Sequence, residues 1–263
     1  MSNLEFERER PAAPRVVVVG LASCFGCQLQ ITNAEPYLLD VLGQIALRYW
    51  QLASSDPMPE EFDVAVIEGA GTTAEAIETL KAVRKKASAV IAVGACATTA
   101  GIPGMAAGNV EAGAAAVYGE AGAPEACGEL VDPAPISAYI DVDFEVLCCP
   151  IDTFAFIDVL QRAIYGSNRL PQTATLCGEC KHNDRGCFFG RGILCLGLVT
   201  RCGCGARCTS LGRPCNGCAG LSPDSNVEAA RYVVGKRGLE VARFNDALEM
   251  FNAVAINAAQ GEE

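Results

Sequence analysis

Cysteine is the residue type with the most chemistry to offer in this chain. The 263 residues include 15 cysteines and one histidine, with six cysteines before residue 177 and nine between Cys177 and Cys218. Residues 1–10 are charged and mixed, unlike an export signal. We therefore expect a cytoplasmic protein with reduced thiols, whose cysteines bind a metal or an iron-sulfur cluster rather than pair as disulfides.

Four of the first six cysteines follow apolar runs of the sequence. Cys24 and Cys27 lie in SCFGCQ, Cys96 lies in GACATTAGIPG, and Cys149 lies in CCPID. A cubane cluster binds one thiolate per iron, so four thiolates that converge from separate loops meet its requirement. A lone CxxC pair also suits a redox dithiol or half of a zinc site, and a single cysteine is often only a small apolar residue.

The other nine cysteines lie in a short segment that is rich in glycine and poor in large apolar side chains. It begins with CGEC, ends with CNGC, and contains Cys177, Cys180, Cys187, Cys195, Cys202, Cys204, Cys208, Cys215 and Cys218. Such a segment needs a bound metal group to organise it. Zinc is an alternative. However, nine cysteines at uneven spacings with one histidine match two cubanes and one spare thiol better than two zinc sites.

The elements that position the first cysteines predict an α/β domain with a parallel sheet. Apolar, β-branched runs that end in glycine predict buried strands. We expect strands at Arg15–Gly20, Leu47–Leu52, Phe62–Gly69, Ala89–Gly94 and Phe144–Leu147, and helices at Pro36–Ala46, Thr72–Lys86 and Ile151–Ile164. The carboxyl ends of parallel strands meet at one edge, where such sheets bind their ligands. The four cysteines are expected at this edge.

The chain changes character near residues 166–175, which predicts two domains, 1–165 and 166–263. Residues 226–258 predict one or two helices. Their expected packing positions are Val227, Tyr232, Val233, Leu248, Phe251 and Val254. The net charge of −11 argues against binding to nucleic acid or to an anionic membrane. The uncharged stretch 87–110 is broken by glycine and proline and does not predict a membrane span.

Taken together, the motifs resemble the small subunit of nickel-iron hydrogenases over almost the whole chain. SCFGCQ resembles the family's CxGC loop, IEGAG its VEG strand end, VGACATTAGIPG its GxCAxxGGIP loop, and CCPID its GCPP or GCPID turn. CLGLVTRCGC and RPCNGC are similar to the family's CxGPVT…C and PCxGC. Six motifs in order are far more specific than any single CxxC pair.

The resemblance implies a flavodoxin-like domain, followed by a small, irregular iron-sulfur domain with C-terminal helices. It implies three 4Fe-4S clusters. The proximal ligands would be Cys24, Cys27, Cys96 and Cys149; the distal ligands Cys177, Cys180, Cys187 and Cys195; and the medial ligands Cys204, Cys208, Cys215 and Cys218. Cys127, Cys148 and Cys202 are left over. Ligation by cysteine alone resembles the cytoplasmic enzymes of this family, which reduce coenzyme F420, NAD(P) or viologen dyes.

The resemblance also implies partners. The nickel-iron centre belongs to a larger partner subunit, so this chain would conduct electrons to a soluble acceptor or to a flavin or iron-sulfur reductase subunit. Phe25 stands where the family often has a proton-transferring threonine or serine, so that role does not carry over, and Leu198 replaces a proline. Glu68 matches a family glutamate near the cluster. No catalytic residue is expected in this chain itself.

Two alternatives remain at this point. One is the related cluster subunit of respiratory complex I, a quinone reductase, which shares the first domain. That subunit has adjacent cysteines in its first motif, whereas the adjacent pair here is Cys148 and Cys149 in the last motif of the first domain. It also lacks the second cysteine segment. The other alternative is a zinc-stabilised interaction protein, which iron content would distinguish from both electron-transfer functions.

Overall fold

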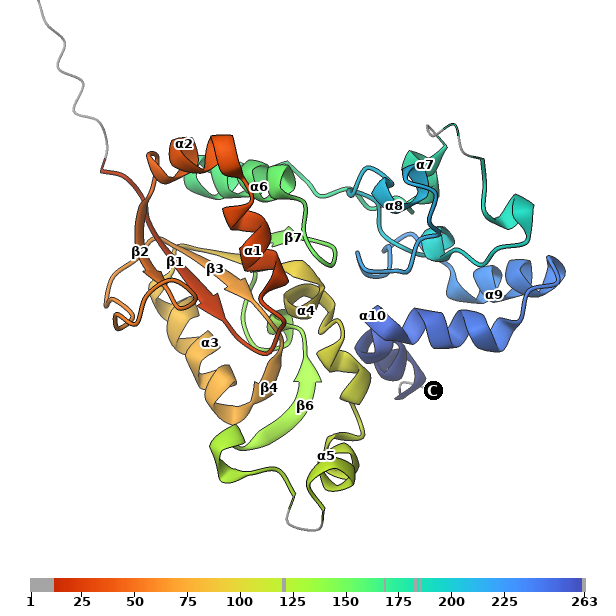
Figure 1. Cartoon of the computed structure of the whole chain (residues 1–263), viewed down its shortest axis with the longest axis horizontal. Coiled ribbons are helices and arrows are strands. Elements are labelled where there is room, and N and C mark those ends of the chain that lie inside the picture. The colour runs from red at the N-terminus through yellow and green to blue at the C-terminus, as the bar shows by residue number, and fades with distance from the viewer. Residues whose placement is uncertain (1–11, 120–121, 168, 182–183, 185, 262–263) are drawn as a thin grey trace, which may run out of the picture.

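The computed structural model describes residues 12–119, 122–167, 169–181, 184 and 186–261. Residues 1–10, which the sequence presents as unlike an export signal, lie outside this range. The chain forms a parallel sheet flanked by helices, followed by an irregular cysteine-rich segment and two C-terminal helices (Figure 1). Within the described residues, no helix is both long and apolar enough to cross a membrane.

The sheet has five strands, and each neighbouring pair is parallel. Its order is β2-β1-β3-β5-β7, which is the flavodoxin-like arrangement. The strands are β1 (Arg15–Gly20), β2 (Ala46–Trp50), β3 (Val64–Glu68), β5 (Ala89–Val93) and β7 (Phe144–Val146). The predicted α/β class and its parallel sheet are therefore confirmed, and the three central strands are buried on both faces as their β-branched sequences require.

Helices cover both faces of this sheet (Figure 1). On one face, α1 (Gly26–Thr32) and α6 (Thr153–Tyr165) supply Cys27, Ile31 and Leu160 to an apolar core with the strands. On the other face, α3 (Ala74–Lys86) and α4 (Gly94–Thr99) supply Leu80 and Ala97. The result is a three-layer sandwich, with the sheet between two layers of helices.

Capping side chains fix where the two long flanking helices begin. Thr73 Oγ1 accepts a hydrogen bond from Ala76 N at 3.1 Å before α3, and Asp152 Oδ1 accepts from Phe154 N and Ala155 N at 3.0 Å before α6. The helix expected over 36–46 is shorter than predicted. A 3-10 turn at Glu35–Tyr37 precedes α2 (Leu38–Leu42), and the chain then turns at Gly43 to enter β2.

Some elements of this domain have no counterpart among the predicted ones. Strands β4 (Gly71–Thr73) and β6 (Leu130–Ala134) form an antiparallel pair beside the main sheet. Helix α5 (Val110–Tyr118) and several 3-10 turns connect the remaining parts. These elements are short, and their glycine and proline residues hide any strand or helix periodicity.

The region after residue 166 has little regular structure before its last two helices. It contains α7 (Cys177–Cys180), α8 (Arg207–Ser210), α9 (Val227–Lys236) and α10 (Val241–Gly261). Leu248 and Phe251 are buried as predicted. Tyr232 and Val233 are 67% and 38% exposed, so their predicted packing is wrong. Helix α9 instead buries Ala230 and Val234, four residues apart on one face.

The C-terminal helix returns to the sheet domain. Helix α10 packs against α4 and the 3-10 turn Pro103–Ala106, which follow β5 (Figure 1). Arg201 Nη1 of the cysteine-rich segment lies 2.9 Å from Glu145 Oε2 of β7. These contacts hold the cysteine-rich segment against the sheet domain near the carboxyl ends of β5 and β7.

Candidate functional site

The first four cysteines lie beyond the carboxyl ends of the strands. Cys24 follows β1, Cys27 lies on α1, Cys96 lies on α4 after β5, and Cys149 follows β7. Their thiols are near enough to influence one another's ionisation. The charges of Cys149 and Cys24 raise the pKa of Cys96, and the charge of Cys149 raises the pKa of Cys27. We refer to Cys24, Cys27, Cys96 and Cys149 as the sheet-edge set.

Two of these cysteines, Cys27 and Cys96, lie on helices, whereas the sequence predicts all four in loops. Each is in the first turn of its helix, where backbone N–H groups have no partner within the helix. Gly94 begins α4 with a φ of +81°, and a Cβ atom there would stand 2.4 Å from Cys27 Sγ. Only glycine leaves room for the thiol of Cys27 at this point.

Glu68, at the end of β3, binds the backbone of the sheet-edge set. Its side chain is 1% exposed, and its carboxylate accepts hydrogen bonds from Cys27 N at 3.1 Å and Gln28 N at 3.3 Å. The carboxylate therefore caps α1 from the end of β3, across 40 residues of sequence. Gln28 is also buried, and its Oε1 accepts from Trp50 Nε1 at 2.6 Å. Glu68 thus fixes the position of Cys27 through its backbone.

The second set consists of Cys177, Cys180, Cys187 and Cys195, which we call the outer set. Cys177 and Cys180 lie on α7, and the thiol of Cys195 interacts electrostatically with those of Cys180 and Cys187. Gly197 lies against two of its sulfurs, since a Cβ atom there would be 3.6 Å from Cys177 Sγ and 3.7 Å from Cys195 Sγ. The backbone N–H of Gly197 lies near enough to Cys195 to act to lower the pKa of its thiol.

The third set, Cys204, Cys208, Cys215 and Cys218, lies between the other two and is called the middle set. The thiol of Cys218 interacts with that of Cys204, and the thiol of Cys208 with both. Cys215 connects this set to the outer set, because its backbone N–H donates to Cys195 Sγ at 3.2 Å. Cys218 lies beside the sheet-edge set, because the backbone N–H of Cys149 is near enough to act to lower the pKa of its thiol.

Cys148, which the sequence left without a partner, contacts the middle set. Its thiol lies close enough to those of Cys204 and Cys218 to lower the pKa of both. The other two spare cysteines lie elsewhere. Cys127 is exposed in the 3-10 turn Glu125–Cys127, and Cys202 is buried and donates its S–H to Gln172 Oε1 at 3.2 Å. The contact of Cys148 joins segments that are distant in the sequence, so no local signal indicates it.

Most of these thiols are hard to ionise on their own. Burial, assisted by the charges of neighbouring cysteines, raises the pKa of Cys96 and Cys177 to about 11 and that of Cys215 to about 12. Burial also raises the pKa of Cys27. The nearby thiol of Cys148 acts in the opposite direction and lowers the pKa of Cys204 and Cys218. Thiolates in such sets require a cation to balance their charge, and metal binding releases their protons.

The donor sets fit iron-sulfur clusters. Cysteine thiols are the ligands of 4Fe-4S clusters, and N–H groups aimed at sulfur are the bonds that tune them. Within the described residues, no group of three or more His, Cys, Asp or Glu side chains is placed to hold a metal ion. A cubane does not need such a group, because each thiolate binds a different iron.

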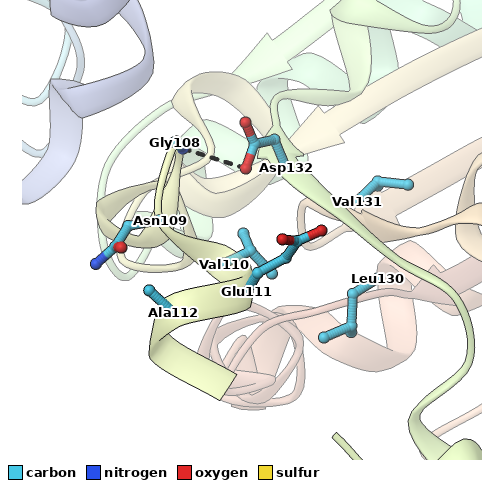
Figure 2. A pocket seen from close by; sticks show the side chains of 8 residues that line it. All are labelled: Gly108, Asn109, Val110, Glu111, Ala112, Leu130, Val131 and Asp132. Carbon is cyan, nitrogen blue, oxygen red and sulfur yellow. Dashed lines mark hydrogen bonds between the residues drawn. The ribbon is translucent and has the colours of Figure 1, made fainter. Parts of the chain in front are cut away.

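A pocket of about 490 Å³ lies apart from these sets, between the start of α5 and β6 (Figure 2). Asp132 Oδ1 accepts a hydrogen bond from Gly108 N at 3.1 Å at its rim, and Glu111 brings a second carboxylate. The residues that line it are Gly108, Asn109, Val110, Glu111, Ala112, Leu130, Val131 and Asp132. Its lining contributes no thiol and is not part of the candidate site.

Comparison with known proteins places this arrangement in a family. Residues 24–163 match the family model of the NADH ubiquinone oxidoreductase 20 kDa subunit, which is more than half of the chain. The delta subunit of sulfhydrogenase 2 from Pyrococcus furiosus is 35% identical over 211 residues, which cover 80% of this chain and 87% of that protein. The chain belongs to this family, among its nickel-iron hydrogenase small subunits.

Further relatives agree with this membership. A subunit of the F420-non-reducing hydrogenase vhu from Methanocaldococcus jannaschii is 31% identical over 265 residues, which cover 87% of this chain and 91% of that protein. A solved structure of an NAD+-reducing [NiFe]-hydrogenase in the H2-reduced state contains a chain that superposes with a TM-score of 0.55 at 26% identity. The match covers 60% of this chain and 95% of that one. The predicted family resemblance is confirmed.

Proposed function

We propose that this small subunit conducts electrons between the nickel-iron centre of a partner large subunit and a soluble acceptor or a reductase subunit. Three 4Fe-4S clusters would be held by the sheet-edge set (proximal), the middle set (medial) and the outer set (distal). The observation that carries the proposal is the serial connection of these sets. Cys215 N donates a hydrogen bond to Cys195 Sγ at 3.2 Å, and the backbone N–H of Cys149 lies near enough to Cys218 to act to lower the pKa of its thiol.

The residues of this chain would act as ligands and as hydrogen-bond donors. When bound, the clusters would supply one-electron transfer between positions too far apart for direct exchange. Backbone N–H groups lie near sulfur in all three sets: those of Ile151, Gly197 and Ala206 act to lower the pKa of Cys27, Cys195 and Cys204. Such donors stabilise negative charge on sulfur and set the potential at which each cluster accepts an electron.

The exposed side of the sheet-edge set supports a partner on that side. Cys24 and Cys149 are exposed, and Leu29 and Phe154 on the neighbouring helices α1 and α6 are 53% and 62% exposed. An oxygen-sensitive cluster and apolar side chains are stable there when a second subunit covers them. We propose that the large subunit binds here, and that the complex works in the cytoplasm, where the fifteen free cysteines stay reduced.

The names of the relatives do not agree on one electron acceptor. One is NAD+-reducing, and others are F420-non-reducing. The complex I alternative has support from the family model, but that match ends at residue 163 and does not include the two later cysteine sets. Co-purification of a nickel-containing subunit would distinguish a hydrogenase from a quinone reductase, and acid-labile sulfide would distinguish both from a zinc protein.

The test replaces a ligand at the far end of the proposed chain of clusters. In the complex with the large subunit, Cys180→Ser should remove or impair the distal cluster and slow H2-dependent reduction of the electron acceptor by about tenfold or more. H2/D+ exchange on the large subunit should stay within about twofold of the wild type. Cys127→Ser, which changes an exposed cysteine outside all three sets, is the matched control and should alter neither activity.

Two results would contradict the proposal. Loss of H2/D+ exchange in Cys180→Ser would mean that the outer set lies next to the large subunit rather than at the end where electrons leave for the acceptor. If the wild-type complex contains zinc and no acid-labile sulfide, the cysteines have a structural role and do not transfer electrons. About twelve iron and twelve sulfide per chain is the content expected of the wild type.

A further inference from the structure

The side chain of Glu179 links the outer set to the middle set. Glu179 lies on α7, between Cys177 and Cys180 of the outer set. Its Oε1 accepts a hydrogen bond from Gly203 N at 2.8 Å, and Gly203 directly precedes Cys204 of the middle set. One carboxylate therefore ties α7 to the start of the middle set across 24 residues of sequence.

The second oxygen of this carboxylate has no such partner. Glu179 Oε2 is buried from solvent, and within the described residues it accepts no hydrogen bond. A buried carboxylate oxygen without a donor costs free energy. A glutamine could accept the same N–H from Gly203 without bringing a charge. The link between the two sets therefore does not require the charge that Glu179 brings to this place.

We propose that Glu179 is a positioning residue that holds the middle and outer sets together and, through its charge, lowers the reduction potentials of the medial and distal clusters. This inference rests on the proposed function, because it presumes clusters at both sets. A reduced cluster carries one more negative charge than the oxidised one, so a buried carboxylate close to it opposes reduction. Electrons that reach the distal cluster are then more strongly reducing toward the acceptor.

The test is an EPR-monitored redox titration of the whole complex. Glu179→Gln removes the charge and keeps a side-chain carbonyl that can accept from Gly203 N, so the link remains. It should favour reduction of the medial and distal clusters by about threefold to tenfold, which is about 28 to 59 mV for a one-electron couple. The proximal cluster, whose ligands belong to the sheet-edge set, should keep its potential.

Glu179→Ala separates the link from the charge, because it removes the acceptor as well. Its medial and distal potentials should rise as in Glu179→Gln. Hydrogen exchange of the Gly203 amide should also increase by about tenfold or more, since its hydrogen bond to a charged group is lost. In Glu179→Gln, exchange of this amide should stay within about threefold of the wild type.

Asp184→Asn is the matched control. Asp184 is the only other acidic residue in 177–218, and it is exposed, so solvent screens its charge. This variant should change each reduction equilibrium by less than about twofold. The inference is wrong if Glu179→Gln leaves either the medial or the distal potential unchanged, or if Asp184→Asn shifts them equally. Loss of iron from Glu179→Gln would also overturn it, since the carboxylate would then be needed to assemble a cluster.

The same titration separates this inference from the proposed function. If wild-type complex shows fewer than three clusters, the proposed function itself fails, whatever the variants do. If the wild type shows three clusters and Glu179→Gln titrates like the wild type, the electron-transfer function stands and the role of Glu179 is wrong.

Discussion

The sheet-edge set and the two later sets are built in opposite ways. The sheet-edge set gathers residues up to 125 positions apart at the ends of regular elements, over a core that includes the buried apolar residues of the central strands. The middle and outer sets use cysteines close in sequence, joined by single helical turns and isolated bridges. The first site is therefore positioned by hydrophobic packing, whereas the later ones have little packing of their own and depend on what the cysteines bind.

Removal of iron should give the largest difference in stability between the cysteine-rich segment and the sheet. Anaerobic chelation should increase hydrogen exchange of amides in 177–218 by about a hundredfold or more, because metal ligation supplies much of their folding free energy. Amides in β1, β3 and β5 should change by less than about threefold. Hydrogen exchange with mass spectrometry measures both regions in one sample. Equal acceleration of the sheet strands would contradict the proposed difference.

Matched core truncations give the next largest effect. Leu80 of α3 and Leu248 of α10 are both 0% exposed, and replacing either by Ala should cost about 2 to 5 kcal/mol of unfolding free energy. Leu80→Ala should destabilise the sheet domain, since Leu80 packs in its core. Leu248→Ala should instead release iron from the middle and outer sets, because Leu248 packs with Leu196 beside Cys195.

Thermal unfolding and iron analysis distinguish the two variants. Leu248→Ala should lose up to about eight of about twelve iron atoms while the proximal EPR signal persists. If both variants lose all clusters together, the two regions fold as one cooperative unit, and the contrast between them would be wrong.

Glu68 tests the sheet-edge set alone. Glu68→Ala leaves the buried N–H groups of Cys27 and Gln28 without an acceptor, which should cost about 1 to 2 kcal/mol. Glu68→Gln keeps one carbonyl acceptor and should cost less. Denaturant unfolding gives the stability, and the proximal EPR signal reports whether Cys27 has moved. A changed signal from the outer set in either variant would contradict a local role.

The sequence predicts the strands of the sheet better than it predicts which thiols come together beyond the strand ends. Strands β1, β3 and β5 follow directly from β-branched runs, because burial on both faces leaves an apolar stretch. Which thiol faces which set does not follow, because Cys148 and Cys204 are brought together by packing between distant segments. Apolar character alone predicts Tyr232 and Val233 in the core, whereas the buried face of α9 is defined by residues such as the small Ala230.

The assignment of ligands to the three sets depends on the family resemblance. Spacing alone indicates that nine cysteines in 177–218 form two groups, but several divisions of nine into two groups of four are equally consistent with it. The structure brings Cys195 near both Cys180 and Cys215, so even proximity leaves Cys195 and Cys215 at a shared boundary. The domain division at 165 and 166 stays a prediction, since α10 packs against elements on both sides of it.

The smallest effect concerns the ion pair that joins the two regions. Arg201 and Glu145 are 17% and 33% exposed in their side chains and 2.9 Å apart, so Arg201→Gln should cost at most about 1 kcal/mol. Lys86→Gln is the matched control within the sheet domain, because Lys86 pairs with Glu60, whose side chain is 90% exposed, and its loss should be close to neutral. Denaturant midpoints measure both. If the two regions are held together by α10 rather than by this pair, Arg201→Gln will leave proteolysis of residues 166–175 unchanged; rapid cleavage there would make the ion pair the main connection.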